Sequence, residues 1–313
     1  MNTDCPLCKG VKIDPAYALS RVQHQDFPVV NCNDCGTFFL HPAPSEEILM
    51  ESYSEKYHGS REKKFVGIIQ RIRISEVNRR YKLCEQRLPN KAKMLDIGCG
   101  EGLFIEKFRK HGTDVLGIEV SDIADQRSSK KGLRVIKGTF EEVDLKGEKF
   151  DLISLVHVFE HLSEPYAVLD KIGNHFNPSG QLLIVIPNIS SWQAQIFKGN
   201  WFHWDPPRHL FLCTPKALIQ KMDGMDYELV HERYHSLEMN PFGLFQSILN
   251  RLGFKRDAFY TLIKNNKKSH HFSFLGAYLH VILLLCIPFL ILEDLIASLF
   301  KRGATVEFLF QKK

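Results

Sequence analysis

The chain has 313 residues, of which 44% are apolar, and this composition is typical of one large globular domain with small appendages. The net charge of +5, from 41 Lys and Arg against 36 Asp and Glu, is too small to indicate a nucleic-acid-binding protein. Ten Lys and Arg stand against four Asp and Glu from Met239 onward, so the positive excess lies in the C-terminal quarter.

Residues 1–44 begin without the basic and apolar runs of a secretory signal, so we expect the protein in the reducing cytoplasm. Two Cys-x-x-Cys pairs follow, Cys5 with Cys8 and Cys32 with Cys35, separated by 23 residues. Two such turns supply the tetrahedral sulfur set that structural zinc prefers. Disulfides are disfavoured in that compartment, and a rubredoxin-like iron is the lesser alternative. We predict a structural Zn2+ that holds together a module too small for a core of its own.

Residues 45–90 are predicted to form a linker with one long helix over residues 61–88. Apolar residues recur there at helical spacing. They are Phe65, Ile68, Ile69, Ile72 and Val77. Such a helix either covers one face of a sheet or forms a lid over a cofactor, and the two roles are compatible.

A glycine-rich turn at residues 94–104 organises the core, which we place at residues 91–238. The pattern predicts a buried strand ending at Asp96, a turn through three glycines, and a helix that begins at Leu103. Glycines allow a ligand to approach the backbone closely. A second strand ends at Glu119, where a carboxylate can accept both hydroxyls of a ribose. No Gly-Lys-Ser/Thr follows the turn, which excludes a P-loop.

Five motifs in order resemble those of the class I S-adenosylmethionine-dependent methyltransferases. They are residues 95–102, 117–121, 150–154, 157–162 and 178–188. The resemblance implies a Rossmann-like α/β fold, with a seven-stranded sheet and helices on both of its faces. It also implies S-adenosylmethionine as cofactor, with the glycines at the methionine end and Glu119 at the ribose. The implied cofactor contacts are Asp96, Gly98, Cys99, Gly100, Gly102, Glu119, Val120, Thr139, Phe140 and Val156. Many relatives carry an acidic residue after the glycine of the third strand, whereas Thr139 follows Gly138 here.

The strand over residues 150–155 delivers His157, Glu160 and His161 to the carboxyl edge of the sheet. Their spacing at i, i+3 and i+4 would direct all three side chains the same way on a helical turn, as a three-ligand metal site requires. A similar Glu-Val-x-Glu-His stretch is thought to bind a divalent metal in ubiquinone-pathway O-methyltransferases, although His157 replaces the first Glu here. The alternative, which we favour, is that Glu160 and His161 orient the helix and wall a pocket.

Residues 191–213 form an aromatic segment at the same edge. These aromatics either pack the segment onto the sheet or line a dry pocket for an apolar acceptor. Residues 208–210, Arg-His-Leu, resemble the x-His-Leu of a bacterial methyltransferase subgroup in which the histidine is a candidate general base. Methyl transfer is an in-line displacement that needs alignment, exclusion of water and removal of a proton. The candidate bases are therefore His209 first and His157 second.

Residues 239–302 are a basic and apolar insertion, followed by a last core strand at residues 303–313. Residues 272–292 are long and apolar enough to reach across a bilayer, with basic residues at both ends of the insertion. A single span is disfavoured because the chain must return to the sheet on the same side. The remaining interpretations are a re-entrant hairpin that turns near Pro288, a membrane-surface element, or a helix packed on the domain or in a dimer. We expect peripheral or re-entrant membrane contact through residues 264–302, at the inner face of the cell membrane.

We therefore predict an S-adenosylmethionine-dependent methyltransferase. The zinc ribbon and its Phe-x-x-Pro-x-Pro linker, which ends at Pro44, resemble a subgroup associated with sugars and polysaccharides. This likeness favours O- or C-methylation of a small-molecule or lipid-linked glycan acceptor, in cell-surface polysaccharide biosynthesis. The alternatives are an aromatic or quinone-type O-methyltransferase with a divalent metal, an RNA methyltransferase, and a non-catalytic membrane-docked scaffold. The ribbon lacks a basic patch, so we expect no nucleic-acid partner.

Overall fold

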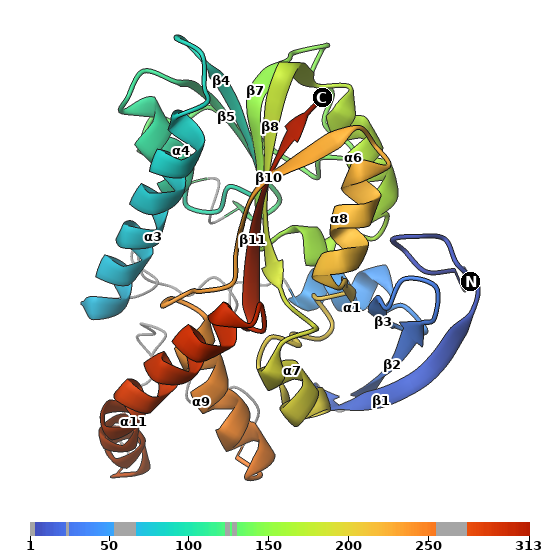
Figure 1. Ribbon diagram of the computed structural model, residues 1–313, viewed down its shortest axis with the longest axis vertical. Helices are drawn as coiled ribbons and strands as arrows, with labels where there is room; N and C mark the ends of the chain where they lie inside the picture. Colours follow the sequence, from blue (N-terminus) through green and yellow to red (C-terminus); the bar gives the residue numbers. More distant parts are fainter. Residues whose placement is uncertain (1–3, 23–24, 53–66, 123–125, 127–129, 255–273) are drawn as a thin grey trace.

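The computed structural model describes all residues except 1–3, 23–24, 53–66, 123–125, 127–129 and 255–273. The described chain forms a seven-stranded sheet flanked by helices and a smaller four-stranded sheet beside it (Figure 1). Two of the sequence predictions fall outside these residues. They are the N-terminal part of the 61–88 helix and the basic cluster of Lys264, Lys267 and Lys268.

The large sheet has the strand order β10-β11-β8-β7-β4-β5-β6. Its strands are β4 (Lys93–Ile97), β5 (Asp114–Glu119), β6 (Val135–Lys137), β7 (Phe150–Val156), β8 (Phe176–Pro187), β10 (Tyr227–Arg233) and β11 (Thr305–Lys312). Strands β4 to β8 run parallel, while β11 is antiparallel to both of its neighbours, β8 and β10. The predicted Rossmann-like seven-stranded sheet is thus confirmed, with the final strand of the chain inserted beside β8.

Helices cover both faces of this sheet, as Figure 1 shows. One face packs against α3 (Ile68–Glu85) and α4 (Leu103–Arg109), and the other against α6 (Pro165–Gly173) and α8 (Pro215–Asp223). The strands between them are buried on both sides, which explains their nearly continuous apolar sequences. The carboxyl ends of the parallel strands therefore all meet at one edge, where a ligand has access.

The inner side of α3 is more polar than its sequence pattern predicts. Glu76 and Arg80 are buried, whereas Ile68 is 67% exposed. The reason is Glu307 of β11, a buried carboxylate that accepts hydrogen bonds from both guanidinium groups of Arg79 and Arg80. A buried charge is stable only when it is paired, so this contact sets the orientation of the helix in place of its isoleucines.

The four-stranded sheet joins the N-terminal module to a distant part of the chain. Its order is β1 (Ile13–Val22), β2 (Gln25–Cys32), β3 (Phe38–Leu40) and β9 (Phe211–Leu212). Phe38 pairs with Leu212 and Phe39 with Phe211. Helix α1 (Glu46–Ser52) follows β3. The module is therefore completed by a strand from the aromatic segment at residues 191–213, and this contact between distant parts of the sequence positions the site described below.

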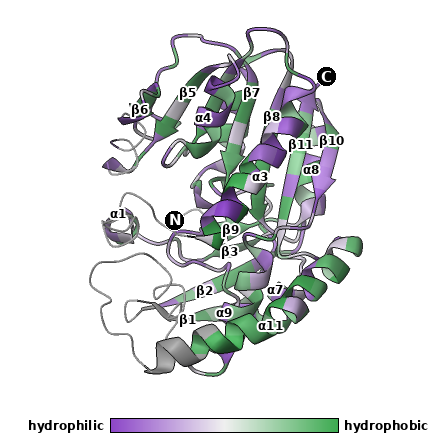
Figure 2. Cartoon of the chain, turned by 90° about the vertical axis from the view of Figure 1, so that its left-hand side faces the viewer, coloured by the Kyte–Doolittle hydropathy of each residue, from purple (hydrophilic) through white to green (hydrophobic). Residues whose placement is uncertain are grey.

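Three helices lie together beyond the carboxyl ends of the parallel strands, at the lower end of the molecule in Figures 1 and 2. They are α7 (Trp192–Phe197), α9 (Asn240–Arg251) and α11 (Phe274–Leu299). Helix α11 continues through Pro288, so of the interpretations considered for this run, the hairpin that turns near Pro288 is wrong. Within it, Val281–Leu299 is long and apolar enough to cross a membrane by length and composition, with a mean hydropathy of 2.4.

Candidate active site

The glycine turn after β4 has the conformation that its sequence predicts. Gly98, Gly100 and Gly102 all have positive φ angles, of 69°, 54° and 71°. The backbone N–H of Gly98 donates to the carbonyl oxygen of Ile118 over 2.8 Å, which holds the turn against the end of β5. A Cβ atom on Gly100 would meet no described atom within 4 Å, so the backbone there faces open space. This exposed backbone is a suitable cradle for a cofactor.

Glu119 lies at the end of β5 and connects the two loops at this edge. Its Oε2 accepts a hydrogen bond from the Gly100 N–H at 2.7 Å, and its Oε1 accepts one from the Ser121 N–H at 2.8 Å. The side chain is 7% exposed. Each carboxylate oxygen can accept a further hydrogen bond, so Glu119 can meet a pair of ribose hydroxyls in the expected position.

Asp96 near the end of β4 is 3% exposed and accepts a 2.6 Å hydrogen bond from the Ser154 hydroxyl. Burial raises the pKa of Asp96 to about 7, and the charge of Glu119 adds to this while Ser154 opposes it. The folded protein thus keeps this carboxyl protonated over a pH range in which the unfolded chain releases the proton. Its contribution to the free energy of unfolding is present at acidic pH and is lost as pH rises toward 7.

We therefore expect Asp96→Asn to become more stable than the wild type above pH 7, by more than about 1 kcal/mol. The difference should be smallest near pH 3, where the aspartate is mostly neutral in both the folded and the unfolded state. Urea unfolding from pH 3 to 8 measures this difference. Asp114→Asn, at an exposed position on β5, is the control. Parallel pH profiles for all three proteins would contradict the assignment.

The other expected cofactor contacts differ in how their side chains lie. Cys99 packs against Gly117 inside the core, so only its backbone faces the turn's open side. Phe140 is also a core residue, with Lys171 over its ring, and Thr139 donates its hydroxyl to Glu142. Two further contacts remain accessible. They are Val120, which is 46% exposed, and Val156, which is partly buried at the carboxyl end of β7.

A cluster of histidines surrounds a buried carboxylate after β7. Glu160 is 1% exposed, and neither carboxylate oxygen has a hydrogen-bond partner among the described residues. The His157 Nδ1 atom approaches its Oε1 to 3.6 Å, and the His209 Nε2 atom approaches it to 3.9 Å. Burial by itself would raise the pKa of Glu160, but the neighbouring imidazoles hold it below its usual range. A buried, ionised carboxylate that has imidazole neighbours but no hydrogen bond from the described residues indicates a place for a cation or a proton.

The three potential ligands that come together differ from the predicted trio. Glu160, His161 and His209 have ligand atoms within 4.8 Å of one another, whereas His157 is outside this set. The predicted helical turn is only a 3-10 turn, Phe159–His161, and His157 precedes it with a φ of 57°. Helical spacing therefore does not apply to His157. A histidine from a distant segment takes its place.

The rings of His161 and His209 are each oriented by a hydrogen bond from the Nδ1 atom to a backbone carbonyl oxygen. The Nδ1 of His161 lies 2.9 Å from the carbonyl oxygen of Arg208, and the Nδ1 of His209 lies 2.7 Å from that of His203. A carbonyl oxygen only accepts, so each Nδ1 carries the proton and each Nε2 keeps its lone pair in the neutral ring. Burial lowers the pKa of His161 to about 4, so this ring is neutral at physiological pH. Anchoring of this kind is typical of metal-binding histidines.

The segment that carries His209 is fixed by three kinds of contact. Arg208 forms a bidentate ion pair with Asp205, and the Leu210 N–H donates to the Glu160 carbonyl oxygen at 2.9 Å. The carbonyl oxygen of Leu210 accepts from the Leu40 N–H, in the pairing that leads to β3 and β9. The pairing between β3 and β9 was not predicted from the sequence, because nothing local in residues 38–40 or 211–212 indicates that they pair.

The aromatic residues of this segment serve mainly as core. Trp201 and Trp204 are fully buried, and the Trp204 Nε1–H donates to the Tyr17 hydroxyl at 2.8 Å. They pack between the segment and the four-stranded sheet. Of the two roles considered for these aromatics, packing is therefore the one that these tryptophans fulfil.

The four N-terminal cysteines come together as predicted. Their sulfur atoms lie within 4.8 Å of one another, with 3.6 Å between Cys5 and Cys35 and 3.6 Å between Cys8 and Cys32. These distances are too long for disulfides. A tetrahedron with metal–sulfur bonds of about 2.3 Å has sulfur–sulfur edges of about 3.8 Å, so the cluster fits a Zn2+ ion.

Comparisons with known proteins agree with this geometry. A sequence profile described as a methyltransferase domain matches residues 69–232, just over half of the chain. The ubiquinone biosynthesis O-methyltransferase of Azorhizobium caulinodans is 33% identical over 149 residues, covering 44% of this chain and 59% of that protein. The protein of the same name from Rhodopseudomonas palustris is 33% identical over 167 residues, covering 48% and 62%. The chain thus matches less than two thirds of the length of these relatives.

A solved structure shows the same fold without implying the same substrate. Coclaurine N-methyltransferase, bound to N-methylheliamine and SAH, superposes with a TM-score of 0.50 at 15% identity, covering 86% of this chain and 82% of that one. At this identity the likeness concerns the fold alone.

Proposed function

Because this chain belongs to the methyltransferase-domain family and has the class I S-adenosylmethionine-dependent fold, we propose that it methylates a hydroxyl oxygen of a small-molecule acceptor in the cytoplasm. The relatives at 33% identity are named as O-methyltransferases of ubiquinone biosynthesis. This supports a phenolic or quinol-type acceptor better than the glycan acceptor that the zinc ribbon suggested.

S-adenosylmethionine supplies an electrophilic methyl group on a sulfonium sulfur, and the chain has to position it. We assign the open backbone at Gly100 to the methionine end and the Glu119 carboxylate to the ribose. Glu119 also holds Gly100 directly, so the ribose contact and the shape of the turn depend on one side chain. This coupling supports binding of both halves of the cofactor at a single preorganised edge.

We assign Glu160, His161 and His209 to a divalent metal at the acceptor site. The observation that carries this assignment is the buried Glu160 carboxylate without a hydrogen-bond partner, beside two imidazoles anchored through Nδ1. The donor set of two nitrogens and one carboxylate suits a divalent transition metal or zinc. Such an ion lowers the pKa of a bound hydroxyl and so makes the acceptor oxygen nucleophilic.

His157 is then the residue placed to accept the acceptor's proton. Its side chain is 27% exposed, and its Nδ1 lies 3.6 Å from Glu160, which stabilises the imidazolium once the proton has arrived. Without a metal, His209 becomes the general base, with Glu160 as its partner at 3.9 Å. The two schemes therefore differ in the base, which is His157 when His209 binds a metal and His209 when no metal is present.

A Mn2+ titration followed by electron paramagnetic resonance separates these schemes, because Mn2+ prefers oxygen and nitrogen ligands to the four-cysteine cluster. We expect one Mn2+ site per chain in the wild type, weakened at least tenfold by Glu160→Gln and by His209→Ala. His157→Ala should retain the site but lower turnover by 10²-fold or more. His175→Ala is the control, since the Nδ1 of this histidine lies 2.8 Å from the carbonyl oxygen of Glu148, which precedes β7 at the amino end of that strand. If the wild type shows no Mn2+ site and His209→Ala lowers turnover more than His157→Ala does, the result would favour His209 as the general base.

We also assign Cys5, Cys8, Cys32 and Cys35 to a structural Zn2+, which supports the proposed module at residues 1–44. The four sulfurs come from two turns, and the Gly10 N–H lies 3.4 Å from the Cys8 sulfur. Strand β3 of this module pairs with β9, which follows His209 closely in the sequence, so the zinc supports the acceptor site through this pairing. The function that we assign to the zinc is to keep β3 in place against β9.

A further inference from the structure

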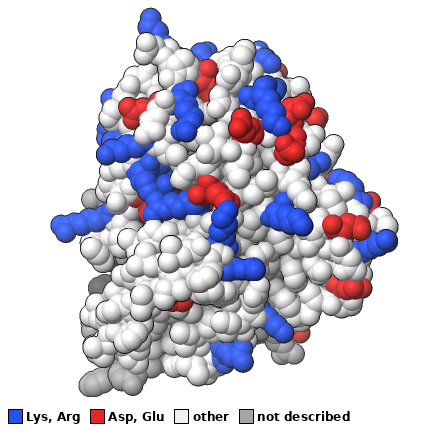
Figure 3. All heavy atoms as spheres, in the orientation of Figure 1, with Lys and Arg blue, Asp and Glu red and all other residues white. Residues whose placement is uncertain are grey.

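The outer side of α11 is an unusually large exposed apolar surface, which we call the α11 face. Its large apolar side chains are 36% to 82% exposed. They are Val281, Leu284, Leu285, Ile287, Phe289, Leu292, Leu295, Ile296, Leu299 and Phe300. Figure 3 shows few charged side chains over this end of the molecule, in contrast to the opposite end. A contiguous surface of this kind indicates an interaction site, since single exposed apolar residues are common but such clusters are not.

The inner side of α11 is fixed to the protein by packing and by its two acidic groups. Leu279 and Leu290 pack with Phe245 and Leu249 of α9. Asp294 is fully buried, where it accepts a 2.6 Å hydrogen bond from the Asn240 side chain and lies 2.5 Å from the His235 Nδ1 atom. Glu293 accepts from Gln193 of α7. These are the only acidic residues in α7, α9 and α11, so the α11 face carries no negative charge.

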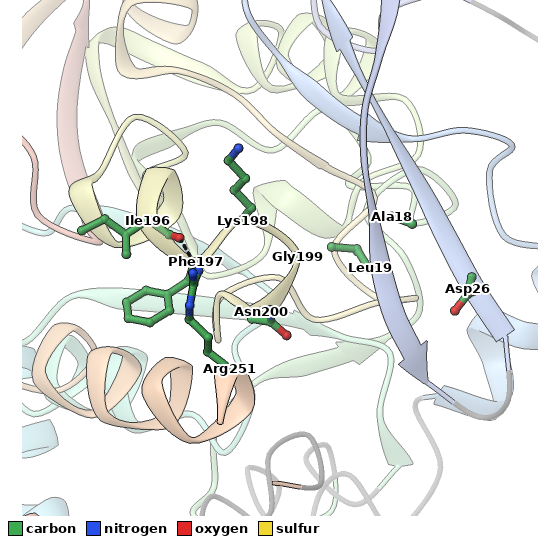
Figure 4. Close-up of a pocket in the computed structure, with 9 residues that line it drawn as sticks. All are labelled: Ala18, Leu19, Asp26, Ile196, Phe197, Lys198, Gly199, Asn200 and Arg251. Atoms are coloured by element: carbon green, nitrogen blue, oxygen red, sulfur yellow. Dashed lines mark hydrogen bonds between the residues drawn. The ribbon is translucent and has the colours of Figure 1, made fainter. Parts of the chain in front are cut away.

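Two exposed cations lie at the carboxyl ends of the neighbouring helices α7 and α9. Lys198 and Arg251 are exposed and line a pocket of about 460 Å³ between α7, α9 and the β1–β2 hairpin (Figure 4). Arg251 donates one hydrogen bond to the Ile196 carbonyl oxygen and keeps further donors, while Asp26 lies across the pocket on the hairpin. Exposed apolar side chains adjoin the two cations. They are Ile196 at 60%, Ile248 at 38% and Leu252 at 68% exposure.

We propose that α7, α9 and α11 dock this protein on the surface of a bilayer that contains anionic lipid, with α11 in the plane of the interface. The apolar face would enter the boundary between headgroups and acyl chains, and Lys198 and Arg251 would meet lipid phosphates. A spanning position conflicts with the structure, because α11 is packed on α9 and the chain enters β11 six residues after Leu299. A second copy fits less well, since it adds the same cations and no exposed acidic group from these helices.

Vesicle flotation of the full chain tests this proposal, which does not depend on the identity of the methyl acceptor. The wild type should bind vesicles of phosphatidylglycerol and phosphatidylcholine at least tenfold more tightly than vesicles of phosphatidylcholine alone. Leu285→Asp combined with Phe289→Asp should lower binding to both at least tenfold, since these side chains are 71% and 74% exposed and a change there leaves the core intact. Val11→Asp, at a position 69% exposed in the N-terminal module, should bind like the wild type.

A second pair of variants tests how much the two cations contribute to the binding of anionic lipid. Lys198→Gln combined with Arg251→Gln should weaken binding to the anionic vesicles by about 25-fold, at roughly fivefold for each cation, and leave binding to phosphatidylcholine unchanged. Arg109→Gln combined with Lys110→Gln, at the end of α4, should have no effect. The proposal is overturned if the wild type does not bind anionic vesicles or if the aspartate variant still binds them. It is also overturned if sedimentation equilibrium shows a dimer that only the aspartate variant dissociates.

Discussion

Glu119→Ala is expected to weaken the binding of S-adenosylmethionine by about 10²-fold or more. The carboxylate would lose its hydrogen bonds to the ribose, each worth about 1.5–3 kcal/mol for a charged acceptor. The same change leaves the Gly100 and Ser121 N–H groups without their present partner, so the turn itself is also less well ordered. Isothermal titration calorimetry with S-adenosylmethionine and S-adenosylhomocysteine measures this loss.

Two further variants test whether the loss of cofactor affinity is specific to the Glu119 carboxylate. Glu228→Ala, at an exposed position on β10, should bind the cofactor like the wild type. Glu119→Gln keeps the shape of the side chain but loses its charge, and it should lie between the wild type and the alanine variant. Undiminished affinity of the alanine variant would remove Glu119 from the site.

Cys32→Ser is expected to abolish zinc binding and to lower methyl transfer at least tenfold while cofactor affinity is retained. Loss of one of four thiolates leaves an incomplete ligand set and lowers the binding free energy of a structural zinc, which is about 10–16 kcal/mol in small zinc modules. The unfolded module would release β3 from β9, and the segment that carries His209 would lose its clamp. The glycine turn belongs to the other sheet and should keep its structure.

The matched control is Cys286→Ser, because this partly buried cysteine of α11 lies outside the four-sulfur cluster. Metal content by mass spectrometry should be one zinc per chain in the wild type and in the control, and none in Cys32→Ser. Full activity in a zinc-free Cys32→Ser protein would show that the module does not support the acceptor site.

Local sequence patterns predicted the features that depend on neighbouring residues. The glycine turn, the placement of Glu119 after β5 and the joining of two Cys-x-x-Cys turns all follow from steric and chemical needs within short segments. The late strand β11 was also predicted, because residues 303–310 resemble the last strand of the methyltransferase sheet.

Features that depend on distant residues were not predictable in the same way. His209 joins Glu160 through a strand pairing that no local pattern encodes. His157 stays near Glu160 but outside the three-ligand set, and it has a left-handed backbone where the spacing argument assumed a helical one. The inner face of α3 is polar because Glu307, more than 200 residues away, is buried against it. Helix α11 continues through Pro288 because its packing on α9 and the buried Asp294 fix it on both sides of that residue.

Calorimetry of the purified wild-type chain with S-adenosylmethionine tests whether this protein binds its proposed cofactor. We expect saturable binding at one site per chain, with S-adenosylhomocysteine competing for the same site and Glu119→Ala losing both. A folded, zinc-containing sample that binds neither compound would contradict it, and the protein would then be a scaffold that has kept the fold without its cofactor.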